Sequence, residues 1–146
     1  MGQFKKARLL QEETVNLMER GLGTTHAHTI LARSQLANTY VRRGPNIIST
    51  KAIAKRKEAL ENLRLVLGEK DPRTLDCKEL LAEDFFISGS LEKARKLQES
   101  LLVDMFEIFG EEHEHTQRSL KFLEQIRTLI RIRRVLHWWV PAQMLK

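Results

Sequence analysis

Apolar residues recur along most of the chain at spacings of three and four, which is typical of amphipathic helices, and no segment alternates strictly as a half-buried strand would. Glycine or proline interrupts this pattern at intervals and predicts where each helix ends. The pattern therefore predicts an all-α protein of six helices. We expect them at about residues 2–21, 27–43, 50–66, 72–88, 91–109 and 114–139.

A short stretch of sequence is repeated at three of these helix ends. It reads LGTTHAHT from residue 22, LGEKDPRT from residue 67 and FGEEHEHT from residue 109, and its glycines are 45 and 42 residues apart. In each copy the glycine can adopt the left-handed conformation that ends a helix. In the second copy, Asp71 and Pro72 are suited to start the next helix. A period of this length predicts an array of helical repeats.

Two further sets of residues keep the same period. Ala7, Ala52 and Ala94 each lie 16 residues before a repeated glycine, and Gly44 and Gly89 each lie 21 residues after one. The unit is therefore a pair of helices that cross closely at an alanine, and it must stack on its neighbours to bury its apolar side. We predict a right-handed α-α solenoid of about six antiparallel helices.

These registers divide the chain into one repeat domain, residues 1–140, and a C-terminal tail, residues 141–146. The length of 146 residues also favours a single domain, and it is sufficient for a substantial core. The expected parts of the domain are a half repeat at 2–23, full repeats at 24–68 and 69–110, and a degenerate repeat helix at 111–140.

Three stretches resemble tetratricopeptide repeats of the kinesin-light-chain type: QLANTYVRRG from residue 35, LLAEDFFISGSLEKA from residue 80, and the repeated glycine stretch itself. The resemblance covers nearly all of residues 2–123 and implies that the chain opens on the second helix of a repeat. In that family the helix carrying Leu-Ala-x-x-Tyr lines the concave face. Such arrays bind proteins in motor light chains and in NB-ARC- or NACHT-type NTPase receptors. We therefore expect a protein-binding scaffold, either a fragment or a truncated relative of a longer array.

The resemblance also assigns positions on the concave face, one helix at a time. These positions are Leu31, Ser34, Asn38, Val41 and Arg42, then Asp76, Glu79, Glu83, Phe86 and Ile87, then Arg118, Lys121, Gln125, Thr128 and Leu129. The middle set is acidic and its neighbours are partly basic. A protein or peptide partner of mixed charge with an apolar anchor would suit them, and we expect no small-molecule substrate.

The last helix departs most from the repeat. Glu124, Arg127 and Arg131 stand where earlier repeats have alanine, an aromatic residue and glycine. From residue 118 onward there are seven basic side chains and one acidic side chain, which equals the net charge of +6 of the whole chain. One interpretation is a cap on the stack of helices. The other is a basic amphipathic helix that binds an anionic membrane, nucleic acid or a calmodulin-like partner through Arg127, Arg131, Arg134 and Trp138.

The remaining motifs do not favour catalysis. His26 with His28, and His113 with His115, recur because the glycine stretch recurs, and two ligands make no closed metal site. Cys77 is the single cysteine, and we expect it to be buried and inert. There is no glycine-rich phosphate loop and no nucleophile motif. We expect a non-enzyme that uses no cofactor and no metal.

Three features bear on the compartment. No apolar run approaches the length that spans a bilayer. The start, MGQFKKARLL, lacks the apolar core of a secretory signal. A single cysteine fits a reducing environment. Together they predict a cytosolic or nuclear protein, and we expect the cytoplasm.

Overall fold

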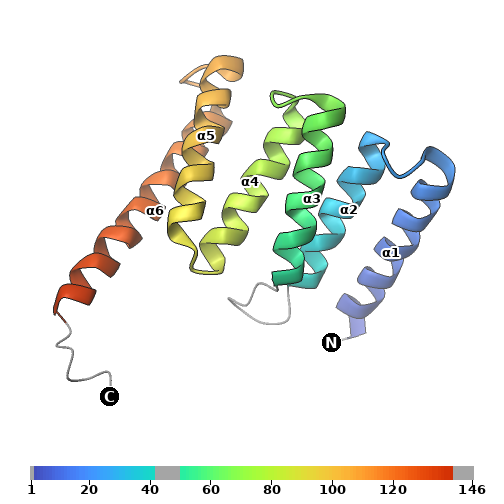
Figure 1. Cartoon of the computed structure of the whole chain (residues 1–146), viewed down its shortest axis with the longest axis horizontal. Helices are drawn as coiled ribbons and strands as arrows, with labels where there is room; N and C mark the ends of the chain where they lie inside the picture. The colour runs from blue at the N-terminus through green and yellow to red at the C-terminus, as the bar shows by residue number, and fades with distance from the viewer. Residues whose placement is uncertain (1, 42–49, 140–146) are drawn as a thin grey trace.

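The computed structural model in Figure 1 describes residues 2–41 and 50–139, with side chains described for residues 6–36, 50 and 52–136. All the secondary structure in these ranges is helical, which confirms the all-α prediction. The helices are α1 (Gly2–Leu22), α2 (Ala27–Val41), α3 (Thr50–Leu67), α4 (Pro72–Ile87), α5 (Leu91–Phe109) and α6 (Glu114–Trp139). The six expected segments are confirmed, including a last helix that runs on to Trp139.

The helices stand side by side in sequence order, from α1 at one end of the molecule to α6 at the other (Figure 1). Each helix packs on the next one along the chain, and α2 also contacts α4. In the view of Figure 1, α3 and α5 lie nearer the viewer than α2 and α4. In this view α3 and α5 therefore lie on the opposite side of the row from α2 and α4.

The repeated glycine stretch forms the joints between α1 and α2, α3 and α4, and α5 and α6. Gly68 has a φ of 91°, and its N–H donates to the carbonyl of Arg64 at 3.0 Å, which closes the last turn of α3. Asp71 then accepts a hydrogen bond from the N–H of Arg73 at 2.9 Å and caps the start of α4. The joint therefore has a structural role, ending one helix and starting the next.

The repeated alanines mark the crossing points of the helices. Ala52 and Ala94 are both 0% exposed, as the sequence predicts for sites where two helices approach closely. Ala7 occupies the same register in α1 but is exposed, because the described part of the chain places no helix against that side of α1. The position is therefore buried only where a neighbouring helix covers it.

A buried ion pair joins three helices in the middle of the row. Arg56 of α3 donates from Nε to Oδ2 of Asp84 in α4 at 2.5 Å, and from Nη1 to the carbonyl of Ser34 in α2 at 3.4 Å. The two charged side chains are 1% and 6% exposed. Burial raises the pKa of Asp84, and the hydrogen bond and positive charge of Arg56 oppose that rise. The pair therefore stabilises the packing only as long as both partners are present.

The next repeat has uncharged side chains at the same two register positions. Gln98 lies 42 residues after Arg56, and Ile126 lies 42 residues after Asp84. Both are 0% exposed, and Gln98 donates from Nε2 to the carbonyl of Ser119 in α6 at 3.1 Å. The fold therefore accepts either an ion pair or an amide with an aliphatic side chain at this position.

We predict that Asp84→Ala lowers the free energy of unfolding by about 3–5 kcal/mol, because it leaves the buried guanidinium of Arg56 without its carboxylate. The double variant Arg56→Gln/Asp84→Ile introduces the uncharged pair found at Gln98 and Ile126, and it should recover most of this loss. Urea unfolding followed by circular dichroism measures both. A loss below about 1 kcal/mol for Asp84→Ala would contradict the assignment of a structural role to the pair.

Candidate functional site

A groove of about 660 Å³ lies between α4 and α6. Its lining residues come from one position on α4 and from four successive turns of α6. They are Phe86 and then Gln117, Leu120, Lys121, Glu124, Gln125, Thr128 and Leu129. The ring of Phe86 meets the ring of Phe122 edge to face, with 5.3 Å between their centroids. This contact holds Phe86 in place at the groove.

Several residues that the sequence assigned to the concave face meet at this groove. Phe86, Lys121, Gln125, Thr128 and Leu129 all line it. The assignment missed Gln117, Leu120 and Glu124, which also line it. In the preceding repeat the same register positions are Leu75, Lys78 and Ala82 of α4, which are buried, the first two against α5. The only signal for the difference was the departure of the last helix from the repeat, at Glu124 in particular.

An acidic row on α4 leads up to the groove. Glu79, Glu83 and Phe86 are spaced by four and three residues and so lie on one face of the helix. Desolvation raises the pKa of Glu83, and the negative charges of Glu79 and Asp84 raise it further, against weaker opposition from Arg56 and Arg118. Arg118 of α6 lies 4.0 Å from Glu79. Glu83 has no ion pair with any residue that the structure describes.

Among the residues expected on α2, Ser34 does not add to this site. Ser34 is 2% exposed, and its Oγ lies 3.5 Å from Sγ of Cys77 in α4, so its side chain belongs to the core. Asn38 lies in α2, but its side chain is outside the described residues, as is Arg42 altogether. The groove described here is therefore formed by α4 and α6.

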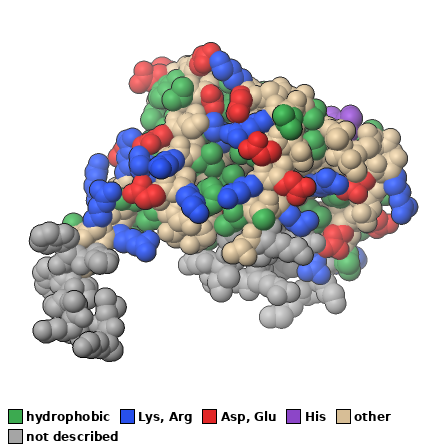
Figure 2. Space-filling view, in the orientation of Figure 1, with side chains coloured by type: hydrophobic (Ala, Val, Ile, Leu, Met, Phe, Trp, Pro, Cys, Tyr) green, Lys and Arg blue, Asp and Glu red, His purple; other side chains and the backbone are tan. Residues whose placement is uncertain are grey.

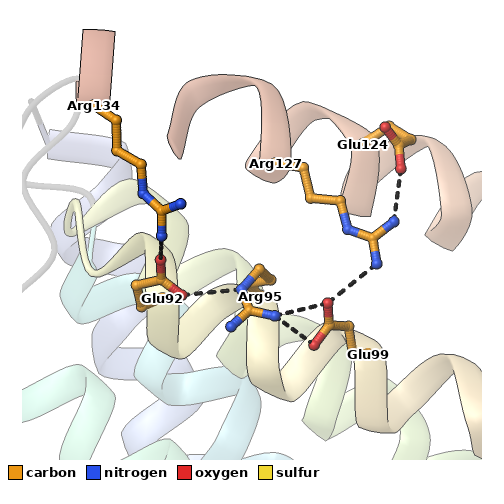
Figure 3. A network of polar contacts seen from close by, with 6 residues as sticks. All are labelled: Glu92, Arg95, Glu99, Glu124, Arg127 and Arg134. Atoms are coloured by element: carbon orange, nitrogen blue, oxygen red, sulfur yellow. Dashed lines mark hydrogen bonds and ion pairs between the residues drawn. The ribbon is translucent and has the colours of Figure 1, made fainter. Parts of the chain in front are cut away.

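The arginines expected to form a basic surface on α6 are partly engaged by α5 (Figure 3). Arg127 lies 3.2 Å from Glu99 and 2.9 Å from Glu124, and Arg134 lies 3.5 Å from Glu92. Arg95 joins the two carboxylates of α5, at 3.0 Å from Glu92 and 2.8 Å from Glu99. An anion approaching Arg127 or Arg134 would therefore compete with a carboxylate already present.

The same end of the molecule carries charges of both signs on its surface. In Figure 2, basic and acidic side chains are intermixed where α5 and α6 lie. Arg131 is exposed, and no residue in the described ranges forms an ion pair with it. The side chain of Trp138 is outside those ranges. Exposed ion pairs such as Arg127–Glu99 and Arg134–Glu92 contribute roughly 0–1 kcal/mol each to stability, so they orient α6 only weakly.

The histidine pairs and the cysteine have structural surroundings. The rings of His113 and His115 lie 5.5 Å apart, and His113 stacks on Phe109 at 4.8 Å. Within the described part of the chain, no group of three or more His, Cys, Asp or Glu side chains is placed to hold a metal ion. Cys77 is buried, and burial raises the pKa of its thiol, which disfavours the reactive thiolate.

No protein-family model matches the chain, and a search of curated proteins finds no significant match. Among the helices described here, none is both long enough and apolar enough to cross a membrane.

We predict that Glu83→Gln changes how stability depends on pH. The pKa of Glu83 in the folded protein is raised above its ordinary value of 4.5, so the folded state holds this proton more tightly than the unfolded state. Its contribution to stability is thus present below pH 4.5 and is lost as the pH rises through the raised pKa. The variant should be more stable than the wild type at pH 7, by less than about 1 kcal/mol because solvent screens an exposed carboxylate.

Thermal unfolding at pH 4 and at pH 7 measures this difference. Glu112→Gln in the joint between α5 and α6 is the matched control for the loss of one negative charge. A Glu83→Gln variant that is less stable than the wild type at pH 7 would contradict the prediction.

Proposed function

We propose that this chain is a scaffold of tetratricopeptide type, a short right-handed α-α solenoid that binds a segment of another protein on the face formed by α2, α4 and α6. The observation that carries the proposal is the groove between α4 and α6. It is lined by Phe86, Lys121, Gln125 and Leu129, all of which the resemblance to tetratricopeptide repeats assigns to the concave face. An apolar floor with polar side chains around it is typical of sites that bind protein segments.

The arrangement of the helices supports the solenoid part of the proposal. Each helix packs on the next, and α2 contacts α4 across the intervening α3. In a stacked array of helix pairs, the first helices of successive repeats are neighbours along one side. The ion pair between Arg118 of α6 and Glu79 of α4, at 4.0 Å, links α4 to α6 in the same way.

A second candidate is binding to an anionic surface through the C-terminal half of α6. The observation in its favour is the exposure of Arg131 and of Arg134, whose side chain is 78% exposed. We rank it second because Arg127 and Arg134 already face carboxylates of α5. A membrane or nucleic acid would have to displace these contacts.

The groove hypothesis predicts where a partner touches the chain. A photo-crosslinking amino acid at Gln125, in the groove, should give a discrete crosslinked product in a cell lysate. The same amino acid at Val103, which is 65% exposed on α5, is the control and should not give this product. Absence of any product specific to Gln125 would contradict the proposal.

Charge reversal provides a second test of the groove. We predict that Glu79→Lys/Glu83→Lys lowers recovery of the crosslinked partner at least about tenfold, which corresponds to 1.4 kcal/mol of binding free energy. Glu58→Lys/Glu61→Lys makes the same change of charge at exposed positions of α3 that do not line the groove, and should leave recovery unchanged. Equal recovery with all three proteins would show that the acidic row takes no part.

The second candidate predicts a different result. The chain should then bind vesicles rich in phosphatidylserine, or RNA, with an affinity that falls as salt concentration rises. Arg131→Gln/Arg134→Gln should abolish this binding, whereas the groove variants should not affect it. Sedimentation with vesicles and a filter-binding titration with RNA measure the two cases, and salt-insensitive or absent binding would rule this candidate out.

A further inference from the structure

We propose that the segment bound in the groove between α4 and α6 is extended and carries a large apolar side chain two positions away from a lysine or arginine. The apolar side chain would enter the space between Phe86 and Leu129, and the cation would lie against Glu79 and Glu83. This inference rests on the proposed function, since it names the class of segment that the same groove selects.

The apolar half of the site is already formed in the structure. Phe86 is partly buried and packs on Phe122, so little side-chain ordering remains for binding. Leu129, on the facing helix, is 40% exposed and would lose that exposure when the groove is filled. The volume of about 660 Å³ lies within the range of ligand pockets, roughly 300–1,000 Å³. One large side chain with the adjoining backbone would therefore fit.

The charged half of the site favours a cation. Asp76, Glu79 and Glu83 form an acidic row on the exposed side of α4. Two cations of α6 oppose it, Arg118 at 4.0 Å from Glu79 and Lys121 in the groove lining, so three acidic groups against two basic ones leave one negative charge in excess. Glu83 is the member three residues before Phe86, and desolvation together with the negative charges of Glu79 and Asp84 raises the pKa of its carboxyl. A lysine or arginine placed there would offset this repulsion, whereas an acidic residue would add to it.

Helix geometry sets the spacing of the two groups. Residues three apart on a helix face, such as Glu83 and Phe86, have Cβ atoms roughly 5–6 Å apart. In an extended segment, alternate side chains point to the same side and lie roughly 6.6–6.8 Å apart along the strand. A cation and an anchor two positions apart therefore match the two sites on α4, whereas adjacent residues would point to opposite sides.

Four matched peptides test the inference by NMR titration of the full ¹⁵N-labelled chain. They are GSSKSLSSG, with both groups; GSSESLSSG, with the charge reversed; GSSKSSSSG, without the anchor; and GSSKLSSSG, with the two groups adjacent. We predict that the first binds at least about tenfold more tightly than each of the others. Its chemical-shift changes should fall on residues 79–86 and 117–129.

Three variants of the chain assign the contacts. Glu83→Gln should weaken binding of GSSKSLSSG but leave GSSESLSSG unaffected or slightly stronger. Leu129→Ser, at a position that is 40% exposed, should weaken binding of GSSKSLSSG and GSSESLSSG, the two peptides that carry the anchor at its proper place. Glu112→Gln should change nothing. Binding of GSSKSLSSG should also weaken as the pH falls and Glu83 is protonated.

The outcomes separate this inference from the proposed function. Tighter binding of GSSESLSSG, or equal binding of all four peptides, would overturn the class of segment but leave the groove as the binding site. No shifts with any peptide, together with retained crosslinking at Gln125, would overturn the class in the same way. Concentration-dependent association of the chain that Leu129→Ser abolishes would overturn it too, because the occupant would then be a second copy.

Discussion

The buried pair between Arg56 and Asp84 fixes the rotation of α4 about its own axis, and the candidate site depends on that rotation. Asp84 must point into the core to meet Arg56 at 2.5 Å. Because successive residues of a helix are about 100° apart, Glu83 and Phe86 are then turned away from Arg56 and toward the groove. On the other side of α4, Lys78 is 2% exposed and donates to Asp104 of α5 at 2.7 Å. Two buried cations thus hold the helix that carries the acidic row.

The period of the sequence and the chemistry inside each repeat are separate properties. The registers of glycine and alanine predicted six helices and three joints. Glycine is required by the backbone conformation of the joint and alanine by the close approach of two helices, and both requirements are the same in every repeat. Arg56 and Gln98 share a register and are both buried, yet one makes an ion pair with Asp84 and the other an amide contact with Ser119. Periodicity alone does not distinguish a buried ion pair from a buried amide contact at this position.

The candidate site could be predicted only in part, because the period of the sequence does not determine which side chains meet between helices. The resemblance to tetratricopeptide repeats assigned Phe86, Lys121, Gln125 and Leu129 to one face, and the structure brings them to one groove. The resemblance assigned Ser34 there too, but its side chain is buried and contacts Cys77, which lies 43 residues away in sequence on a neighbouring helix.

The basic stripe of α6 posed the same difficulty. The positive charge of the stripe could be read from the sequence. The carboxylates of α5 that pair with it could not, because Glu92 lies 42 residues from Arg134 and Glu99 lies 28 residues from Arg127. Contacts across helices decide which exposed charges are available to a partner.

The two ends of the row show why the groove remains available. In the repeat register, α6 takes the position of α2 and α4, and α1 takes that of α3 and α5, so α1 of a second copy placed after α6 would continue the row. An antiparallel pairing of this kind would place Arg131 and Arg134 of one copy beside Lys6 and Arg8 of the next. It would also put Glu124 at the close crossing that Ala82 occupies in α4, where Ala82 is 0% exposed. Like charges and a side chain too large for the crossing both oppose end-to-end stacking. The same substitutions that end the repeat pattern in α6 thus disfavour end-to-end stacking of two copies, which supports the proposal that a different partner occupies the groove.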